Sequence, residues 1–547
     1  MKIALSQLNY HIANFEENSK KIIKSIQKAR EAGAELVVFS ELSVTGYYPH
    51  DLLERKEFIE NAEEAVHTIA KACTGIAALV GAPAINTGSR GKRLYNAAYF
   101  LNNGMIEAIR YKSLLPTYDI FDEYRHFEPN QEFELIEYHG KKLAITICED
   151  LWDEQPTQNE FGRDKLYQTS PMEELSRLQP DLVINLSASP FSYNQENWRK
   201  NILVKNAVRF QLPIVYVNQT GAQTELIFDG GSCFVCSDGT IPVELAYFEE
   251  DFYVVDTDSP REKKQEQKDY IAKIHDALIL GIRDYFRKMN FTAAVLGLSG
   301  GIDSALVCAL AAKALGAESV RGVLMPSKYS SLHSVTDAIR LAENLGIRHD
   351  TITIRDMVDA FEDVLTPVFG SLPPGVAEEN IQARTRGVLV MAISNKFGSI
   401  LLNTTNKSEC AVGYGTLYGD MNGGLAVLGD VYKTDVYKLS AYINREKEII
   451  PQNSIAKPPS AELRPDQKDI DTLPDYAILD AILFRYIELN QSPDEITAAG
   501  FEPATVLKTI RMVNQNEYKR FQAPPILRVS SKAFGFGRKM PLVARYH

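Results

Sequence analysis

The chain has 547 residues, 45% of them hydrophobic and 24% charged, a length that predicts two to four domains, each with its own core. The net charge of -12 argues against nucleic acid as the main partner, because such binding depends on clustered lysine and arginine. No stretch reaches the roughly 18 consecutive apolar residues of a membrane helix, and the start of the chain is typical of a strand and not of a signal peptide. We therefore expect a cytoplasmic protein without a membrane partner.

The first half alternates short apolar strands with amphipathic helices, which predicts an α/β layered fold. Segment 258–269 is almost wholly polar and is predicted to be a linker. The predicted domains are therefore 1–257 and 270–547. Strands are predicted over 3–7, 36–39, 77–81, 97–101, 143–148, 182–186 and 214–218, and helices near 14–32 and 57–71.

The second half repeats the alternation of strands and helices, which predicts a second α/β domain. Parallel strands joined by helices form a doubly wound sheet, and such sheets bind ligands beyond the carboxyl ends of their strands. Strands are predicted over 293–298, 320–325, 350–354 and 399–402, and helices over 306–315, 331–345, 378–397, 475–489 and 503–514.

A glycine turn, 297–304 (GLSGGIDS), joins the first strand of this half to a helix. Exposed amides and the positive end of the helix dipole hold phosphate oxygens, the glycines let the backbone come close, and Asp303 can hold Mg²⁺. A helix start with incidental glycines is the alternative. The run lacks the Gly-Lys-Ser/Thr of a Walker loop and resembles the loop of the ATP pyrophosphatases. That likeness implies ATP contacts from Gly297, Leu298, Ser299, Gly300, Gly301, Ile302, Asp303 and Ser304.

Six cysteines, at positions 73, 148, 233, 236, 308 and 410, are too scattered for a disulfide framework. The pair Cys233 and Cys236 has the spacing of a zinc or redox motif, but no second Cys or His pair stands at a matching distance. The alternation around this pair favours a strand.

Three residues of the first half, Glu41, Lys112 and Cys148, follow strands or lie in a turn. A carboxylate, an ammonium and a thiol can cleave an amide, although each residue alone is more often structural or solvated. An ammonium at ~4 Å and an effective dielectric constant near 20 favours a thiolate by about 4 kcal/mol, roughly three pKa units. We therefore expect Cys148 to be mostly thiolate at neutral pH.

These residues lie in 39–47 (FSELSVTGY), 112–127 (KSLLPTYDIFDEYRHF) and 147–152 (ICEDLW). The three strings resemble the nitrilase, or carbon-nitrogen hydrolase, family, which implies an αββα sandwich for the first domain. The resemblance also assigns roles: Glu41 as general base, Lys112 as oxyanion stabiliser, Cys148 as nucleophile and Glu123 as a supporting carboxylate. Other glutamine amidotransferase types fit badly, since they need Cys at position 2 or a Gly-x-Cys-x-Gly elbow.

The glutamine contacts of that family fall on Tyr118, Ser189 and Gln195. A lysine is common at the third of these positions. Gln195 supplies no cation for the carboxylate of a substrate, and Arg199, four residues later, is a possible replacement.

Further strings in the second half, 379–386 (ENIQARTR), 403–420 (NTTNKSECAVGYGTLYGD), 430–437 (DVYKTDVY), 519–525 (KRFQAPP) and 532–538 (KAFGFGR), resemble NAD synthetases of the glutamine-dependent kind. The resemblance implies amidation of nicotinic acid adenine dinucleotide (deamido-NAD) through an adenylate, with glutamine as the nitrogen source and ATP and Mg²⁺ as co-substrate and cofactor. It also implies a homo-oligomer.

The residues that this second resemblance assigns fall into three groups. ATP contacts are Thr404 and Lys433, Mg²⁺ ligands are Asp303 and Glu409, and deamido-NAD contacts are Asn380, Arg384, Glu409 and Lys519, with Arg386 as the neighbour that competes with Arg384. Two other functions remain open: an amidotransferase acting on another carboxylate or nucleotide, and a nitrilase-like scaffold whose chemistry has decayed.

Overall fold

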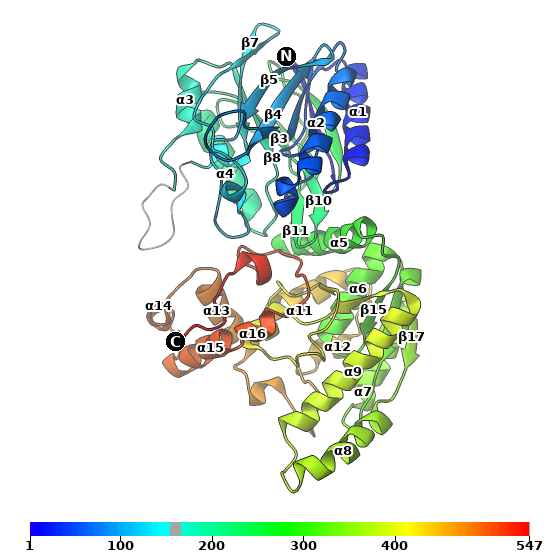
Figure 1. Cartoon of the computed structure of the whole chain (residues 1–547). Coiled ribbons are helices and arrows are strands. Elements are labelled where there is room, and N and C mark those ends of the chain that lie inside the picture. The colour runs from blue at the N-terminus through cyan, green and yellow to red at the C-terminus, as the bar shows by residue number, and fades with distance from the viewer. Residues whose placement is uncertain (154–165, 466, 546–547) are drawn as a thin grey trace. The chain divides into compact units, whose positions relative to one another are not determined.

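The computed structural model describes residues 1–153, 166–465 and 467–545 (Figure 1). The chain divides into two compact units, Met1–Gln267 and Lys268–His547. Within the polar segment 258–269, Lys263 forms a backbone bridge with Val243 and an ion pair of 2.6 Å with Asp251. Part of this segment therefore packs on the first unit through backbone and charge, without the apolar side chains that packing usually requires.

The first unit contains two mixed sheets of six strands in its described part. One has the order β14 (Asp251–Asp256), β1 (Lys2–Gln7), β2 (Leu36–Val38), β3 (Ala77–Ile85), β4 (Leu94–Asn102), β5 (Met105–Tyr111). The other has the order β13 (Val243–Glu244), β12 (Cys233–Val235), β9 (Ile214–Asn218), β8 (Leu182–Ser187), β7 (Lys141–Ile147), β6 (Ile136–Tyr138). A separate hairpin joins β10 (Thr220–Gln223) to β11 (Leu226–Asp229).

Side-chain alternation explains how these sheets stack. Ile3 and Leu5 of β1 share a core with Leu143 of β7, whereas Ala4 faces the helices on the other side of its sheet. Helices α1 (Phe15–Glu31) and α2 (Lys56–Ala72) cover the first sheet, and α3 (Pro171–Arg177) and α4 (Gln195–Phe210) cover the second (Figure 1). The predicted αββα sandwich is confirmed. The strand interpretation of residues around Cys233 also holds, because β12 begins there.

The second unit is built on a five-stranded sheet in which every neighbouring pair is parallel, as the doubly wound prediction requires. Its order is β17 (Arg348–Thr351), β16 (Val320–Leu324), β15 (Ala294–Gly297), β18 (Ile400–Asn403), β19 (Leu425–Ala426). The chain runs outward from β15 in one direction and then resumes at β18 in the other. The carboxyl end of β15 is therefore the topological switch point, where ligands of such sheets bind.

The helices of the second unit follow the predicted order, but the structure adds two long helices that were not predicted, α5 (Tyr270–Lys288) and α8 (Arg355–Phe369), and several shorter ones. The edge strand β17 begins two residues before the predicted segment, because its pairing with β16 starts at Arg348. No helix in the described part of the chain is long and apolar enough to cross a membrane. The helices are α5 (Tyr270–Lys288), α6 (Ile302–Leu315), α7 (Leu332–Leu345), α8 (Arg355–Phe369), α9 (Val376–Phe397), α10 (Lys407–Val412), α11 (Lys433–Ile443), α12 (Gln452–Ala456), α13 (Tyr476–Ile487), α14 (Pro493–Ala498), α15 (Pro503–Gln515) and α16 (Glu517–Arg520).

Candidate active sites

Lys112 lies at the centre of a buried charge network in the first unit. Its Nζ donates to Glu41 Oε1 at 2.7 Å and to both carboxylate oxygens of Glu123 at 2.8 Å. All three side chains are at most 1% exposed. Burial opposes the charge on Lys112, but Glu123 and Glu41 raise its pKa well above the usual value. The two carboxylates therefore favour the charged form of Lys112 and hold its ammonium between them.

Neutral donors fix the two carboxylates. Asn96 Nδ2 donates to Glu41 at 2.7 Å and to Glu123 at 3.3 Å, and the backbone N–H of Ala188 donates to the second oxygen of Glu41 at 3.0 Å. Tyr47 Oη donates to Glu123 at 2.7 Å. Each carboxylate is therefore held in one orientation before any substrate binds.

Cys148 is the first residue of the short helix η3 (Cys148–Leu151), directly after β7. Its φ of 45° is positive, a strained conformation for a residue with a side chain, and such strain concentrates at functional sites. The residue is 7% exposed, and both Glu41 and Lys112 act on its thiol electrostatically. The four residues singled out by sequence, Glu41, Lys112, Glu123 and Cys148, are thus brought together.

The expectation that Cys148 is a thiolate is wrong for this structure. Burial raises the pKa of the Cys148 thiol well above its usual range, and Glu41 raises it further, whereas Lys112 opposes the rise. The single ammonium is shared by two carboxylates, so its charge is already offset before it reaches the sulfur. Cys148 therefore rests as a thiol and needs a base at the moment of attack.

Asp150 joins the turn that carries Lys112 to the turn that carries Cys148. One of its oxygens accepts from the backbone N–H groups of Ser113 and Leu114, and the other accepts from Ile147, all at 2.9 Å. Burial raises the pKa of Asp150 to about 6 although these three donors lower it. Sequence reasoning missed this residue and also Asn96 and Tyr47. A signal existed only for Asn96, a polar residue inside the apolar strand β4.

The three residues predicted to contact glutamine, Tyr118, Ser189 and Gln195, lie in different local environments. Tyr118 Oη donates to Glu149 at 2.9 Å, beside the nucleophile, and burial raises the pKa of Glu149 to about 7. The backbone N–H of Ser189 donates to Asn218 at 2.9 Å, and Gln195 is the first residue of α4.

The suggestion that Arg199 replaces the missing lysine is wrong. Its guanidinium donates to both carboxylate oxygens of Asp229, at 2.9 and 2.8 Å, and the two side chains are 3% and 1% exposed. This buried bidentate pair binds the cation to the core.

In the second unit, the loop between β15 and α6 opens on a cavity of about 300 Å³. Gly300 has φ 77°, and a Cβ there would lie 2.1 Å from the carbonyl oxygen of Ser334, so only glycine fits. Of the predicted ATP contacts, these line the cavity: Gly297, Leu298, Ser299, Gly301, Ile302, Asp303, Ser304, Thr404 and Lys433.

Asp303 and Glu409, which line this cavity, converge on one ammonium. Lys433 Nζ lies 2.5 Å from Asp303 Oδ2 and 3.3 Å from Glu409 Oε1, and its side chain is 2% exposed. Asn406 Nδ2 donates to Asp303 at 2.9 Å. Burial raises the pKa of Glu409 to about 8 although Lys433 lowers it. Two carboxylates facing one point form a donor set of the kind that binds Mg²⁺.

The predicted deamido-NAD contacts meet around the loop that follows α10. Asn380 accepts from Thr416 Oγ1 at 2.7 Å, Arg384 donates to Leu417 O at 3.1 Å, and Lys519 donates to Gly413 O at 2.7 Å. Of the residues assigned to deamido-NAD, Glu409 lines the cavity next to the β15–α6 loop. Arg386, the neighbour of Arg384, lines the cavity as well.

Comparisons with known proteins match each unit to a family. The carbon-nitrogen hydrolase family model matches residues 2–266, and the NAD synthase model matches residues 274–523. A glutamine-dependent NAD(+) synthetase from Synechocystis sp. is 46% identical over 100% of this chain and 99% of its own length. The chain belongs to the glutamine-dependent NAD(+) synthetases.

Other members of the family resemble the chain over its full length. The NAD(+) synthetase of Acinetobacter baylyi is 42% identical over 99% of this chain and 98% of its own. The solved structure of the glutamine-dependent NAD+ synthetase from Acinetobacter baumannii, in complex with ADP, has a TM-score of 0.78 and 39% identity over 99% of this chain and 98% of its own. The Cytophaga hutchinsonii enzyme, at 21% identity and a TM-score of 0.83 over 100% of this chain and 98% of its own, shares the fold.

Proposed function

We propose that the chain makes NAD(+) from deamido-NAD, ATP and the amide nitrogen of glutamine, with one half-reaction in each unit. The observation that carries this proposal is the convergence of Glu41, Lys112, Glu123 and Cys148 in the first unit of a chain whose second unit belongs to the NAD synthases. The presence of an amidase site in the same chain is explained if the ammonia released by the first unit is used by the second.

In the first unit, Cys148 attacks the side-chain carbonyl carbon of glutamine as Glu41 removes the thiol proton. Lys112 stabilises the negative oxygen of the tetrahedral intermediate, and the proton on Glu41 passes to the leaving nitrogen, which departs as ammonia. Glu41 then takes a proton from water, which attacks the thioester. The C–S bond breaks, glutamate leaves, and the proton on Glu41 returns to the Cys148 sulfur, which restores the thiol. Glu123 holds Lys112 in place between two negative charges.

We assign Tyr118, Ser189 and Gln195 to glutamine binding. Tyr118 supports this assignment most directly, since its hydroxyl bonds to Glu149, the neighbour of the nucleophile. Gln195 can offer an amide to the substrate, and no cation.

In the second unit, the carboxylate of deamido-NAD attacks the α-phosphate of ATP, pyrophosphate leaves, and ammonia then displaces AMP from the adenylate. The helix start at Asp303 and Ser304 offers amides to phosphate oxygens, and Lys433 offsets the charge that develops as pyrophosphate leaves. Thr404 adds a contact to ATP, and Asn380, Arg384, Glu409 and Lys519 are assigned to deamido-NAD.

Asp303 and Glu409 are the residues that would hold Mg²⁺. A magnesium ion there would neutralise phosphate oxygens and orient the nucleotide. Lys433 lies between both carboxylates, so a metal ion held by Asp303 and Glu409 would displace its ammonium from them, toward the phosphates.

We further propose a cytoplasmic homo-oligomer.

Ammonia reacts as a nucleophile only while unprotonated, so its transfer between the half-reactions is expected to avoid bulk water.

Two substitutions separate the half-reactions. Cys148→Ala is expected to abolish synthesis from glutamine and to leave synthesis from added ammonia, whereas Asp303→Ala is expected to stop both. Loss of both activities in Cys148→Ala, in a protein that still folds, would contradict the division of labour.

A panel of acids with ATP and glutamine tests the substrate. Turnover of another carboxylate in preference to deamido-NAD would favour the alternative amidotransferase. Failure to release AMP with every acid would favour the decayed scaffold.

A further inference from the structure

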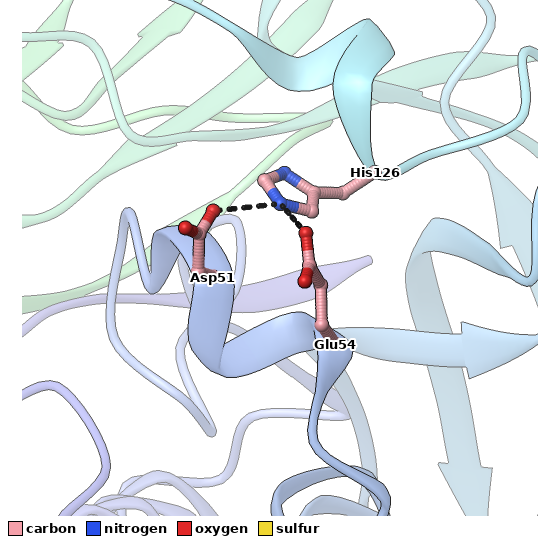
Figure 2. Close-up of side chains that lie close together, drawn as sticks. All are labelled: Asp51, Glu54 and His126. Atoms are coloured by element: carbon pink, nitrogen blue, oxygen red, sulfur yellow. Dashed lines mark ion pairs between the residues drawn. The ribbon is translucent and has the colours of Figure 1, made fainter.

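A cluster of two carboxylates and an imidazole lies at the surface of the first unit, outside the network around Lys112. Asp51 and Glu54 both belong to the short 3-10 helix η1 (His50–Glu54). Residues three apart eclipse one another in such a helix, so the two side chains project from the same face. Figure 2 shows both carboxylates directed at one ring nitrogen of His126.

His126 follows another 3-10 helix, η2 (Glu123–Arg125), and its side chain is 5% exposed. Within the described residues, the Nε2 atom makes no hydrogen bond and lies 3.5 Å from Asp51 Oδ1 and 3.7 Å from Glu54 Oε1. A buried polar nitrogen of this kind is costly unless something binds it.

The other ring nitrogen, Nδ1, faces the hydroxyl group of a tyrosine. Tyr48 Oη lies 2.7 Å from His126 Nδ1 and donates its own proton to Asp122 O at 3.4 Å. In the tautomer whose Nδ1–H donates to the Tyr48 oxygen, the lone pair stands on Nε2, and this is the tautomer that metal binding at Nε2 requires. Metal-binding histidines are fixed in this way by a partner on the nitrogen that does not bind the metal.

We propose that Asp51, Glu54 and His126 form a binding site for Zn²⁺. Their donor atoms all lie within 4.8 Å of one another. Zinc bonds of about 2.0–2.2 Å require the donors to draw somewhat closer. The carboxylates are 65% and 61% exposed, so close packing does not hold them in place. One imidazole with two carboxylates suits zinc better than Mg²⁺ or Ca²⁺, which prefer oxygen alone.

Arg125 is the competitor for this site. Its guanidinium lies 3.0 Å from Asp51 Oδ1 and 3.7 Å from Glu54 Oε1, and its side chain is 51% exposed. Exposed ion pairs of this kind contribute little, so a divalent cation can displace the guanidinium. Zinc and Arg125 therefore compete for the same carboxylates. This competition distinguishes the site from unspecific zinc binding to acidic side chains, which Arg125 would not affect.

Zinc at this position joins η1 to η2. Glu123, which holds Lys112 in the charge network, is the first residue of η2 and stands three positions before His126. Occupancy therefore restrains the segment that carries Glu123 and stabilises the first unit by mass action.

The test is calorimetric titration of the full chain with ZnCl₂ at pH 7.5, combined with thermal unfolding. Wild type is expected to show one more zinc site than His126→Gln and than the double variant Asp51→Asn/Glu54→Gln, with an added rise in Tm. Glu57→Gln, an exposed acid in the first turn of α2, serves as the matched control and keeps the site. Zinc held elsewhere, at cysteines or at Asp303 and Glu409, is common to all of these variants.

Two further variants test the geometry and not merely the charge. Tyr48→Phe keeps the ring and removes the hydroxyl, so zinc is expected to bind about tenfold more weakly. Arg125→Gln removes the competitor, so zinc is expected to bind roughly fivefold more tightly. Equal zinc stoichiometry in wild type and in the double carboxylate variant would overturn the proposal, and so would weaker binding in Arg125→Gln.

Discussion

Lys112→Met tests whether one ammonium holds the amidase site together. The methionine keeps most of the length of the side chain and removes its charge. Glu41 and Glu123 then lose hydrogen bonds of 2.7 and 2.8 Å, and both carboxylates remain in a site that is at most 1% exposed. Removing one partner of a buried ion pair costs about 3–5 kcal/mol. The first unit is expected to lose stability of this order at neutral pH.

The loss is expected to depend on pH with a definite sign. Burial and Glu41 raise the pKa of Glu123, and Lys112 opposes them, so the substitution raises this pKa further. The folded state then binds more protons than the unfolded state above the unfolded pKa of about 4.3. The stability contributed by the protonated carboxyl is present below that pH. It is lost as pH rises through the folded pKa, by at most about 1.4 kcal/mol per pH unit.

Hydrogen exchange of the full chain can measure this effect, with peptides of β4 and β7 as reporters. The double variant Lys112→Met/Glu123→Gln removes one of the stranded charges and keeps the bond from Tyr47 to position 123, so at least half of the lost protection is expected to return. Glutaminase activity is expected to fall by about 10²-fold or more in both variants. Unchanged protection in Lys112→Met between about pH 5 and about pH 8 would refute the reasoning.

Three other predictions follow from the two sites. Because the pKa of Cys148 is raised by burial and by Glu41, its alkylation by iodoacetamide, followed by mass spectrometry, is expected to keep accelerating from about pH 7 to about pH 9; a plateau already reached at neutral pH would show a thiolate. Gly300→Ala is expected to abolish synthesis from either nitrogen source and to leave glutaminase activity intact, because its Cβ would lie 2.1 Å from a backbone oxygen. Gly301→Ala is expected to be tolerated better, because the nearest neighbour of its Cβ would be a side-chain oxygen at 3.2 Å. Equal loss of synthesis in both variants would contradict the steric argument. Arg199→Met is expected to destabilise the first unit by about 3–5 kcal/mol, because Asp229 is left buried without its partner. Urea unfolding measures this loss of stability. Recovery of the loss in Arg199→Met/Asp229→Leu would separate this structural role from glutamine binding.

Much of the fold could be predicted from the sequence, because apolar periodicity records which face of each element is buried. The strand β9 was delimited to the residue, and β1, α1 and α7 to within one residue at each end, whereas α6 begins four residues before the predicted segment. The edge strand β17 was displaced, since its pairing begins on polar residues that carry no apolar signal. The short strands β10 and β11 were not predicted: β10 (TGAQ) carries little apolar signal, and β11 (LIFD) is apolar but only four residues long.

The candidate sites divide along a similar line. Motif strings identified Glu41, Lys112 and Cys148, but no string reveals how charge is shared among residues that meet only after folding. The expected thiolate counted Lys112 and omitted the two carboxylates that surround it. From the sequence, Arg199 was interpreted as a cation available to a substrate, because its partner, Asp229, lies 30 positions away. Asp150 was invisible as a clamp, since its partners are backbone groups.

The clamp formed by Asp150 has a consequence for any attempt to redesign the amidase. One side chain sets the spacing between the loop that brings the sulfur and the loop that brings the positive charge, so lengthening or replacing either loop alone would spoil the alignment of both. Swaps of specificity are therefore best directed at residues outside this tie, with 112–114 and 147–150 transplanted together as one cassette.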